Sequence, residues 1–254
     1  MQIAPRTTLG LLFVAMAAPW LVGWAGGNYW VRVLDFAMLY MMLALGLNIV
    51  VGFAGLLDLG FIAFYAVGAY TAALLSSPHL VQEFSTVAQW FPQGMHFSIW
   101  LIVPLAAGLA AIFGCLLGGP TLKLRGDYLA IVTLGFGEIV RIFMNNLDRP
   151  VNITNGPKGL RAIDSVTIFG LDFSKSIDLG ILRIEPVYLS YYLFLILTII
   201  VAVVSGRLLD SRIGRAWVAI REDELAAKAM GINTRNVKLL AFALGASFGG
   251  VAGA

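Results

Sequence analysis

The sequence has few side chains that could carry chemistry, and the most suggestive are Glu138 and Arg141. They lie three residues apart in an otherwise apolar stretch, so on a helix they share one face. A charged side chain in membrane hydrocarbon costs about 2.5–3.5 kcal/mol on insertion scales, so each should be paired or face a wet cavity. Two interpretations stay open: the pair lines or gates a solute path, or it is a structural ion pair that fixes helix packing.

Other reactive constellations are missing from these 254 residues. The single Cys115 excludes an intramolecular disulfide and a cysteine metal cluster, and His79 and His96 share one polar loop without a ligand set, so we expect no metal site. No HExxH or Ser/Lys arrangement lies in an apolar run, which argues against a membrane-embedded enzyme. No GxxxxGK[ST] phosphate loop occurs, so we expect no cofactor here and any ATP chemistry on a partner.

The elements that must position these charges are membrane helices. Hydrophobic residues make up 59% of the chain and charged residues only 12%, whereas a soluble domain carries roughly 25% charged residues. The mean hydropathy is +0.87. Because backbone groups inside a bilayer must be satisfied internally, the continuous apolar runs predict helices and not the alternating segments of a barrel. The expected fold is all-α, a polytopic transmembrane helical bundle that forms one domain over residues 1–254.

About seven apolar runs approach the roughly 20 residues that a bilayer requires. They are Thr8–Gly26, Val33–Phe53, Leu59–Ser77, Ser98–Gly118, Tyr128–Asn145, Val187–Gly206 and Val237–Ala254. The first run is longer than a typical signal-peptide core, so we interpret it as an uncleaved helix. The last run stops at Ala254 without a polar residue to mark a membrane exit, which favours a C-terminally truncated chain over an end buried in the bundle.

Positive residues near the helix ends predict the orientation. If the segment 206–236 is cytoplasmic, alternation places the N-terminus inside as well. The inside set is then Arg6, Lys123, Arg125, Arg207, Arg212, Arg215, Arg221, Lys228, Arg235 and Lys238. The segment 147–186 lies outside and balances its positive charges with acidic residues. This periplasmic segment, with a turn-rich stretch at Ile153–Leu160, either contacts a delivery protein or plugs the outer mouth of the bundle.

Glycines predict irregular points in two of the helices. Gly135 and Gly137 directly precede the charged pair, and local unwinding there would offer backbone groups to a zwitterionic solute. Asn48, followed by Gly52 and Gly55, indicates a second irregular point. The Asn48 amide either bonds to a neighbouring helix or contacts the solute.

A stripe of small residues marks the final apolar run. Gly245, Gly249 and Gly253 recur every four residues, which predicts a helix face for close packing against another helix. The partner helix lies either in this chain or in another subunit. Asp58 is expected near the membrane interface, where it would cap the helix that begins near Leu59.

The cytoplasmic stretch GRAWVAIREDELAAKAMGINTRNVK, residues 214–238, is the most informative. Asp223 is a suitable N-cap, Glu224 adds negative charge at the helix start, Lys228 follows four residues later and Gly231 supplies a stop. These signals predict a short helix over Glu224–Met230, about 10 Å long at 1.5 Å per residue. It is either a rigid knob for a separate motor protein or an interfacial helix lying on its own bundle.

This loop resembles the coupling loop of ABC-importer permeases, whose pattern is Glu-Ala-Ala, three residues, then Gly. Ala226, Ala227 and Gly231 fit that spacing, but Leu225 holds the Glu position and Glu224 comes one residue early. More specifically, three motifs in the same order resemble branched-chain amino acid permeases of the LivM type, over most of Leu34–Ala254. They are GLLDLGFIAFYAVGAYTAALL at 55–75, KLRGDYLAIVTLGFGEIVR at 123–141 and IREDELAAKAMGIN at 220–233.

The resemblance implies a bacterial inner-membrane permease that takes up leucine, isoleucine or valine. It implies a homologous second permease, two ATP-binding subunits and a periplasmic substrate-binding protein as partners. The residues expected to couple to the ATPase are Arg221, Glu222, Asp223, Glu224, Ala226, Ala227 and Gly231. Three alternatives stay open: a permease for urea or short amides, a permease for other amino acids, and a self-sufficient carrier or channel in which Glu138 and Arg141 gate the path.

Overall fold

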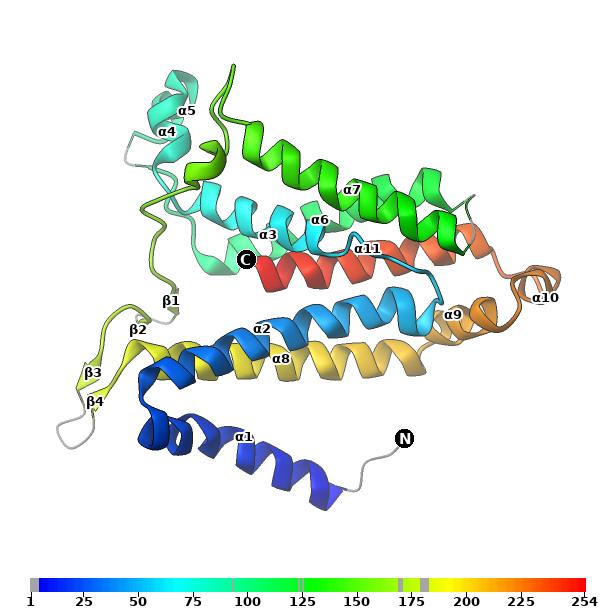
Figure 1. The fold of residues 1–254 in the computed structure, drawn as a ribbon, viewed down its shortest axis with the longest axis horizontal. Coiled ribbons are helices and arrows are strands. Elements are labelled where there is room, and N and C mark those ends of the chain that lie inside the picture. Colours follow the sequence, from blue (N-terminus) through cyan, green and yellow to red (C-terminus); the bar gives the residue numbers. More distant parts are fainter. Residues whose placement is uncertain (1–4, 93, 123, 125, 169–170, 179–182) are drawn as a thin grey trace. The chain divides into compact units, whose positions relative to one another are not determined.

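The computed structural model describes residues 5–92, 94–122, 124, 126–168, 171–178 and 183–254. Lys123 and Arg125, which the sequence assigns to the cytoplasmic side, lie outside the described residues. Helices dominate the described chain (Figure 1), which confirms the all-α helical class. Internal contacts divide the chain into two compact units, Met1–Met42 with Ser165–Ala202 and Leu43–Asp164 with Val203–Ala254.

The first unit combines one whole helix, parts of two others and two small hairpins. Its helices are α1 (Pro5–Gly26), the first part of α2 (Asn28–Asn48) and most of α8 (Pro186–Asp210). Its antiparallel hairpins are β1 (Thr167–Ile168) with β2 (Leu171–Asp172) and β3 (Ile177–Asp178) with β4 (Arg183–Ile184). The hairpins lie in the segment that the sequence predicts to be periplasmic.

The core of the first unit forms around Tyr191 of α8. This side chain is 1% exposed, and its hydroxyl donates a hydrogen bond of 2.8 Å to the carbonyl of Ala15 in α1. Val31 and Met38 of α2 and Leu195 of α8 complete the buried cluster. The tyrosine therefore brings an apolar body and a satisfied polar group to the point where the three helices meet.

The second unit contains the remaining elements. They are η1 (Ile49–Phe53, a π-helix), α3 (Ile62–Leu75), α4 (His79–Glu83), α5 (Ser85–Trp90), α6 (Ile99–Thr121), α7 (Asp127–Asn146), η2 (Gly156–Lys158, a 3-10 helix), α9 (Arg212–Glu222), α10 (Glu224–Ala229) and α11 (Thr234–Gly253).

Among the described residues, four helices are long and apolar enough to cross a membrane: Asn28–Phe53, Ile99–Thr121, Pro186–Asp210 and Thr234–Gly253. Leu12–Gly26 and Ile62–Leu75 are apolar but shorter. The 20-residue α7 carries three charges, Asp127, Glu138 and Arg141. The count of about seven spans therefore stays a prediction.

Helix α11 packs against both α3 and α6 in the second unit (Figure 1). Glycines permit this close packing because a side chain at the same position would clash with the backbone of the neighbouring helix. A Cβ at Gly68 of α3 would lie 2.2 Å from the carbonyl oxygen of Gly250, and one at Gly114 of α6 would lie 2.7 Å from that of Phe242. In lipid, such close packing contributes association energy that a hydrophobic effect cannot supply.

The glycine stripe of α11 finds its partners inside the chain. A Cβ at Gly245 would lie 2.4 Å from a methyl group of Val50, and one at Gly249 would lie 3.1 Å from Cβ of Phe64. A Cβ at Gly253 would lie 2.2 Å from the carbonyl oxygen of Tyr65. The stripe therefore faces η1 and α3.

Gly68→Ala should lower the stability of the protein, because the added methyl group would have to push α3 away from the backbone of α11. Overpacking of this kind costs ~1–3 kcal/mol. Gly108→Ala in α6 is the matched control, since a Cβ there meets nothing within 4 Å. Thermal unfolding in detergent should show a lower midpoint for Gly68→Ala only, and equal midpoints would contradict the packing account.

Candidate functional site

The helix α2 ends in an irregular turn, as its glycines predict. The π-helix η1 follows Asn48 directly, and the chain then reverses at Gly55, whose φ is +68°. A Cβ at Gly52 would lie 2.0 Å from Oδ1 of Asn48, so the glycine makes room for the amide. Among the described residues, no hydrogen bond joins the Asn48 side chain to another helix, and its contact with a solute stays a prediction.

Arg221 of α9 bonds to this irregular turn. Its Nη1 donates a hydrogen bond of 2.6 Å to the carbonyl oxygen of Gly52. Its aliphatic stem packs over Gly55, where a Cβ would lie 2.5 Å from Cγ of Arg221. Gly52 lies in the last turn of η1, where backbone carbonyls lack an intrahelical partner, and the guanidinium satisfies this one. The sequence prediction had assigned Arg221 to the ATPase contact, and this bond gives it an internal partner.

The predicted coupling helix forms at α10. The Asp223 carboxylate caps it by accepting hydrogen bonds from the backbone N–H groups of Leu225 at 2.8 Å and Ala226 at 3.0 Å. Gly231 follows its end with φ of +85°, a conformation that favours glycine. Ala227 is the residue that α10 buries. Local sequence signals therefore account for both ends of this helix.

Two buried side chains hold the loop against α11. Glu224 forms an ion pair of 2.7 Å with Lys238, whose side chain is 10% exposed. The partner of Glu224 is thus not Lys228, which lies four residues further along the helix, because the Glu224 carboxylate points toward the bundle. Trp217 of α9 is fully buried and donates a hydrogen bond of 2.8 Å to the carbonyl of Val237.

The loop nevertheless exposes two large apolar side chains. Leu225 in α10 is 71% exposed and Met230, directly after α10, is 84% exposed, although both belong to a segment that is otherwise braced on the bundle. The two interpretations of this helix are therefore compatible: it lies on its own bundle, and the loop still presents two large apolar side chains.

The segment before α3 lies in close contact with α7. Thr133 accepts a hydrogen bond of 3.0 Å at its hydroxyl oxygen from the backbone N–H of Leu59. A Cβ at Gly60 would lie 2.0 Å from the carbonyl oxygen of Thr133, and one at Gly137 would lie 3.2 Å from Cα of Gly60. Glycine at 60 is thus required for the approach of the two backbones.

The expected unwinding at Gly135 and Gly137 is wrong. Helix α7 runs without a break from Asp127 to Asn146. Gly137 serves the contact with Gly60, so its lack of a side chain permits packing, and the helical hydrogen bonds on either side stay intact. A Cβ at Gly135 would meet nothing within 4 Å, so this glycine has no structural explanation.

Asp58 is buried, at 3% exposed, in the segment between η1 and α3. Its Oδ1 accepts a hydrogen bond of 2.9 Å from the backbone N–H of Gly60, whereas its Oδ2 has no partner among the described residues. Asp58 therefore shapes the turn and does not cap α3, whose N-cap is Phe61. Burial raises the pKa of the Asp58 carboxyl to about 6, against the lowering effect of the Gly60 N–H.

Helices α3 and α7 enclose a groove of about 290 Å³. We call it the α3–α7 groove. Glu138 and Arg141 lie on its α7 side and form an ion pair of 2.8 Å, with side chains 54% and 66% exposed. Apolar and aromatic residues of the opposite wall include Leu59, Ile62 and Tyr65. The pair thus lines a groove and is not sealed inside helix packing.

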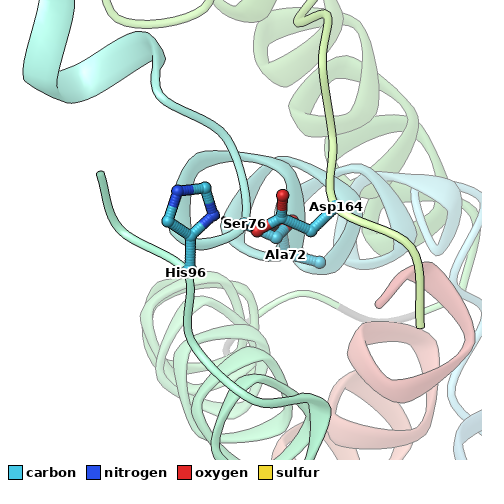
Figure 2. Close-up of polar contacts among 4 residues, drawn as sticks. All are labelled: Ala72, Ser76, His96 and Asp164. Atoms are coloured by element: carbon cyan, nitrogen blue, oxygen red, sulfur yellow. Dashed lines mark hydrogen bonds and ion pairs between the residues drawn. The ribbon is translucent and has the colours of Figure 1, made fainter. Parts of the chain in front are cut away.

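A polar junction joins the end of α3 to two loops of the same unit (Figure 2). The backbone N–H of Asp164 donates a hydrogen bond of 2.9 Å to the carbonyl oxygen of Ser76, and its carboxylate pairs with Nδ1 of His96. Ser76 in turn donates 2.6 Å to the carbonyl of Ala72. Among the described residues, no three His, Cys, Asp or Glu side chains gather into a metal-binding group.

Comparisons with known proteins agree with the motifs. The pattern that defines the permease component of branched-chain amino acid transport systems matches residues 29–254. The high-affinity branched-chain amino acid transport system permease protein LivM of Escherichia coli K12 is 43% identical over 96% of this chain and 55% of its own length. Its namesake in Salmonella typhimurium LT2 is 42% identical over the same shares.

A more distant relative is the probable branched-chain amino acid transport permease protein LivM of Methanocaldococcus jannaschii, 25% identical over 85% of this chain and 63% of its own. The chain thus spans about half the length of the bacterial relatives that it matches. No solved structure matches it.

The stability of the detergent-purified protein should fall as the pH rises from about 4 to about 6. The pKa of Asp58 is raised from 3.8 to about 6 in the folded protein, so the folded state holds this proton more tightly, and that contribution is lost as the pH passes the folded pKa. Asp58→Asn should remove this part of the decline. Thermal unfolding midpoints at pH 4, 5, 6 and 7 would test it, and parallel curves for the two proteins would contradict the assignment.

Proposed function

The chain belongs to the family of permease components of branched-chain amino acid transport systems, and we propose that it is a permease subunit of an ATP-driven importer for leucine, isoleucine and valine. In this proposal the chain forms part of the translocation pathway and performs no bond-making chemistry. ATP hydrolysis belongs to partner subunits, since the sequence holds no phosphate loop. The permease chain in this proposal requires no cofactor of its own.

One observation carries the coupling part of the proposal: α10 is rigidly supported yet presents apolar side chains. Asp223 caps the helix, and the pair of Glu224 with Lys238 holds it on α11. Leu225 and Met230 then extend from this support, 71% and 84% exposed. Exposed large apolar side chains on a braced helix suit contact with another protein, because their burial there is favourable.

The proposed assembly pairs this permease with a second homologous permease, two ATP-binding subunits and a periplasmic substrate-binding protein. The protein would reside in the bacterial inner membrane as a multi-pass subunit with a cytoplasmic N-terminus. The excess of Lys and Arg in 206–236 supports a cytoplasmic position for α9 and α10. The segment 147–186 would then face the periplasm and receive the binding protein.

Leucine uptake into proteoliposomes should require the complete assembly and ATP on the side of α10. Full-length permeases without the ATP-binding subunits should give no flux, because the proposed path opens only under force from the partner. Uptake of radiolabelled leucine, isoleucine, valine and urea would be measured in parallel. Flux without ATP-binding subunits would instead establish a self-sufficient carrier. Uptake of urea alone would instead establish a permease for urea or short amides.

Leu225→Lys and Met230→Lys should each lower ATP-driven leucine uptake by about tenfold or more. Each change places a charge in the proposed apolar contact with the ATPase, and loss of a buried contact of this size corresponds to about 1.5–3 kcal/mol. Both side chains are exposed in the chain, so folding and membrane insertion should not change.

Val151→Lys is the matched control. Val151 is also apolar and 45% exposed, but it lies in the segment predicted to be periplasmic. Co-purification of the ATP-binding subunits would be measured beside uptake for all three variants. Retention of the ATPase and of full uptake by Leu225→Lys and Met230→Lys would remove α10 from the proposed interface.

A further inference from the structure

The α3–α7 groove combines two features that rarely occur together in an apolar chain: one ion pair and an aliphatic wall. From this combination, and resting on the proposed transport of amino acids, we propose that the groove binds the solute as a zwitterion. Arg141 would receive the α-carboxylate, Glu138 would receive the α-ammonium, and the branched side chain would lie on Leu59 and Ile62.

The charges are arranged to receive a second ion pair. Only Nε of Arg141 contacts Glu138, at Oε2. Within the described residues, Nη1 and Nη2 of Arg141 donate no hydrogen bond, and Oε1 of Glu138 accepts none. Guanidinium binds carboxylate in a forked geometry, and a carboxylate accepts from ammonium. An α-amino acid carries both groups on one carbon, so it can meet two neighbouring opposite charges simultaneously.

The position of the pair also favours a functional role. Glu138 lies about 16 Å along the axis of α7 from Asp127, at 1.5 Å per residue, and so near the middle of the helix. If α7 crosses the membrane, as the sequence predicts, charges at this depth are costly unless they pair or line a wet cavity. A simple structural pair would be covered by packing, whereas these two side chains remain more than half exposed and line the groove.

The opposite wall fits an aliphatic side chain. Leu59 is 58% exposed and Ile62 is 55% exposed, and both line the groove beside Val140. A volume of about 290 Å³ lies at the small end of ligand sites, which run roughly from 300 to 1,000 Å³. The backbone contact between Gly60 and Thr133 fixes the spacing of the walls, so the groove is preformed.

The charge variants Glu138→Gln and Arg141→Gln should each lower leucine uptake by about 10- to 100-fold, because each removes one charged hydrogen bond to the solute. The assay uses the complete reconstituted transporter, with ATP hydrolysis and the amount of assembled complex measured in parallel. Ile142→Ala is the control, since Ile142 is an exposed α7 residue that does not line the groove. Its uptake should match that of the unchanged protein.

A labelling experiment separates solute binding from a structural role of the pair. Photo-leucine, an analogue with a diazirine side chain, would be activated on the reconstituted complex without its binding protein, and labelled peptides would be mapped. Label is expected within residues 59–66 and 134–145. Excess leucine should reduce it, whereas 4-methylpentanoate, which lacks the ammonium group, and leucinol, which lacks the carboxylate, should compete at least about tenfold less well. Arg141→Gln should lose the label.

Label confined to other segments, or unchanged label in both charge variants, would overturn the groove assignment. So would efficient disulfide cross-linking of Ile62→Cys to a helix of another subunit, which would show that protein fills the groove. In each case leucine uptake by the unchanged transporter would leave the proposed function standing. Absence of any branched-chain uptake by the unchanged transporter would instead refute the importer itself.

Discussion

The close contact of α11 with α3 and α6 holds together the helices that carry both candidate sites of the second unit. It depends on backbone approaching backbone, as at Gly68 and Gly250, where no side chain larger than hydrogen fits. Because lipid removes the hydrophobic drive between membrane helices, this packing carries much of the association energy. Lys238, which pairs with Glu224 of α10, is itself a residue of α11. The proposed ATPase contact and the wall of the α3–α7 groove therefore share one support.

Charges in this unit are handled in four different ways. Arg221 satisfies the Gly52 carbonyl at the end of η1, and Lys238 neutralises Glu224 beside α10. Asp58 is buried with one backbone hydrogen bond and a raised pKa. Glu138 and Arg141 differ from all of these because their side chains stay open to a groove. Asp58 and Lys238 are buried, whereas Glu138 and Arg141 line a groove with more than half of each side chain exposed, which makes them candidate solute contacts.

The polar connections outside the helices are built from local turns and a few long-range contacts. Asp164, His96 and Ser76 come from three separate parts of the sequence and join the end of α3 to two loops. Such junctions limit how far these loops can move independently of α3. In the proposed importer, these junctions would tie the periplasmic segment, residues 147–186, to the end of α3, where a delivery protein could act on the bundle.

The sequence by itself determined the helical membrane class, the family and the ends of α10, because these depend on hydropathy, motif order and local capping. Asp223 and Gly231 act within a few residues of their own positions, so their roles could be predicted. Tertiary structure alone decided that Glu224 pairs with Lys238 and that Asp58 shapes a turn. It also decided that α7 stays continuous through Gly137. Each of these outcomes depends on which distant backbone lies alongside, and sequence spacing does not contain that information.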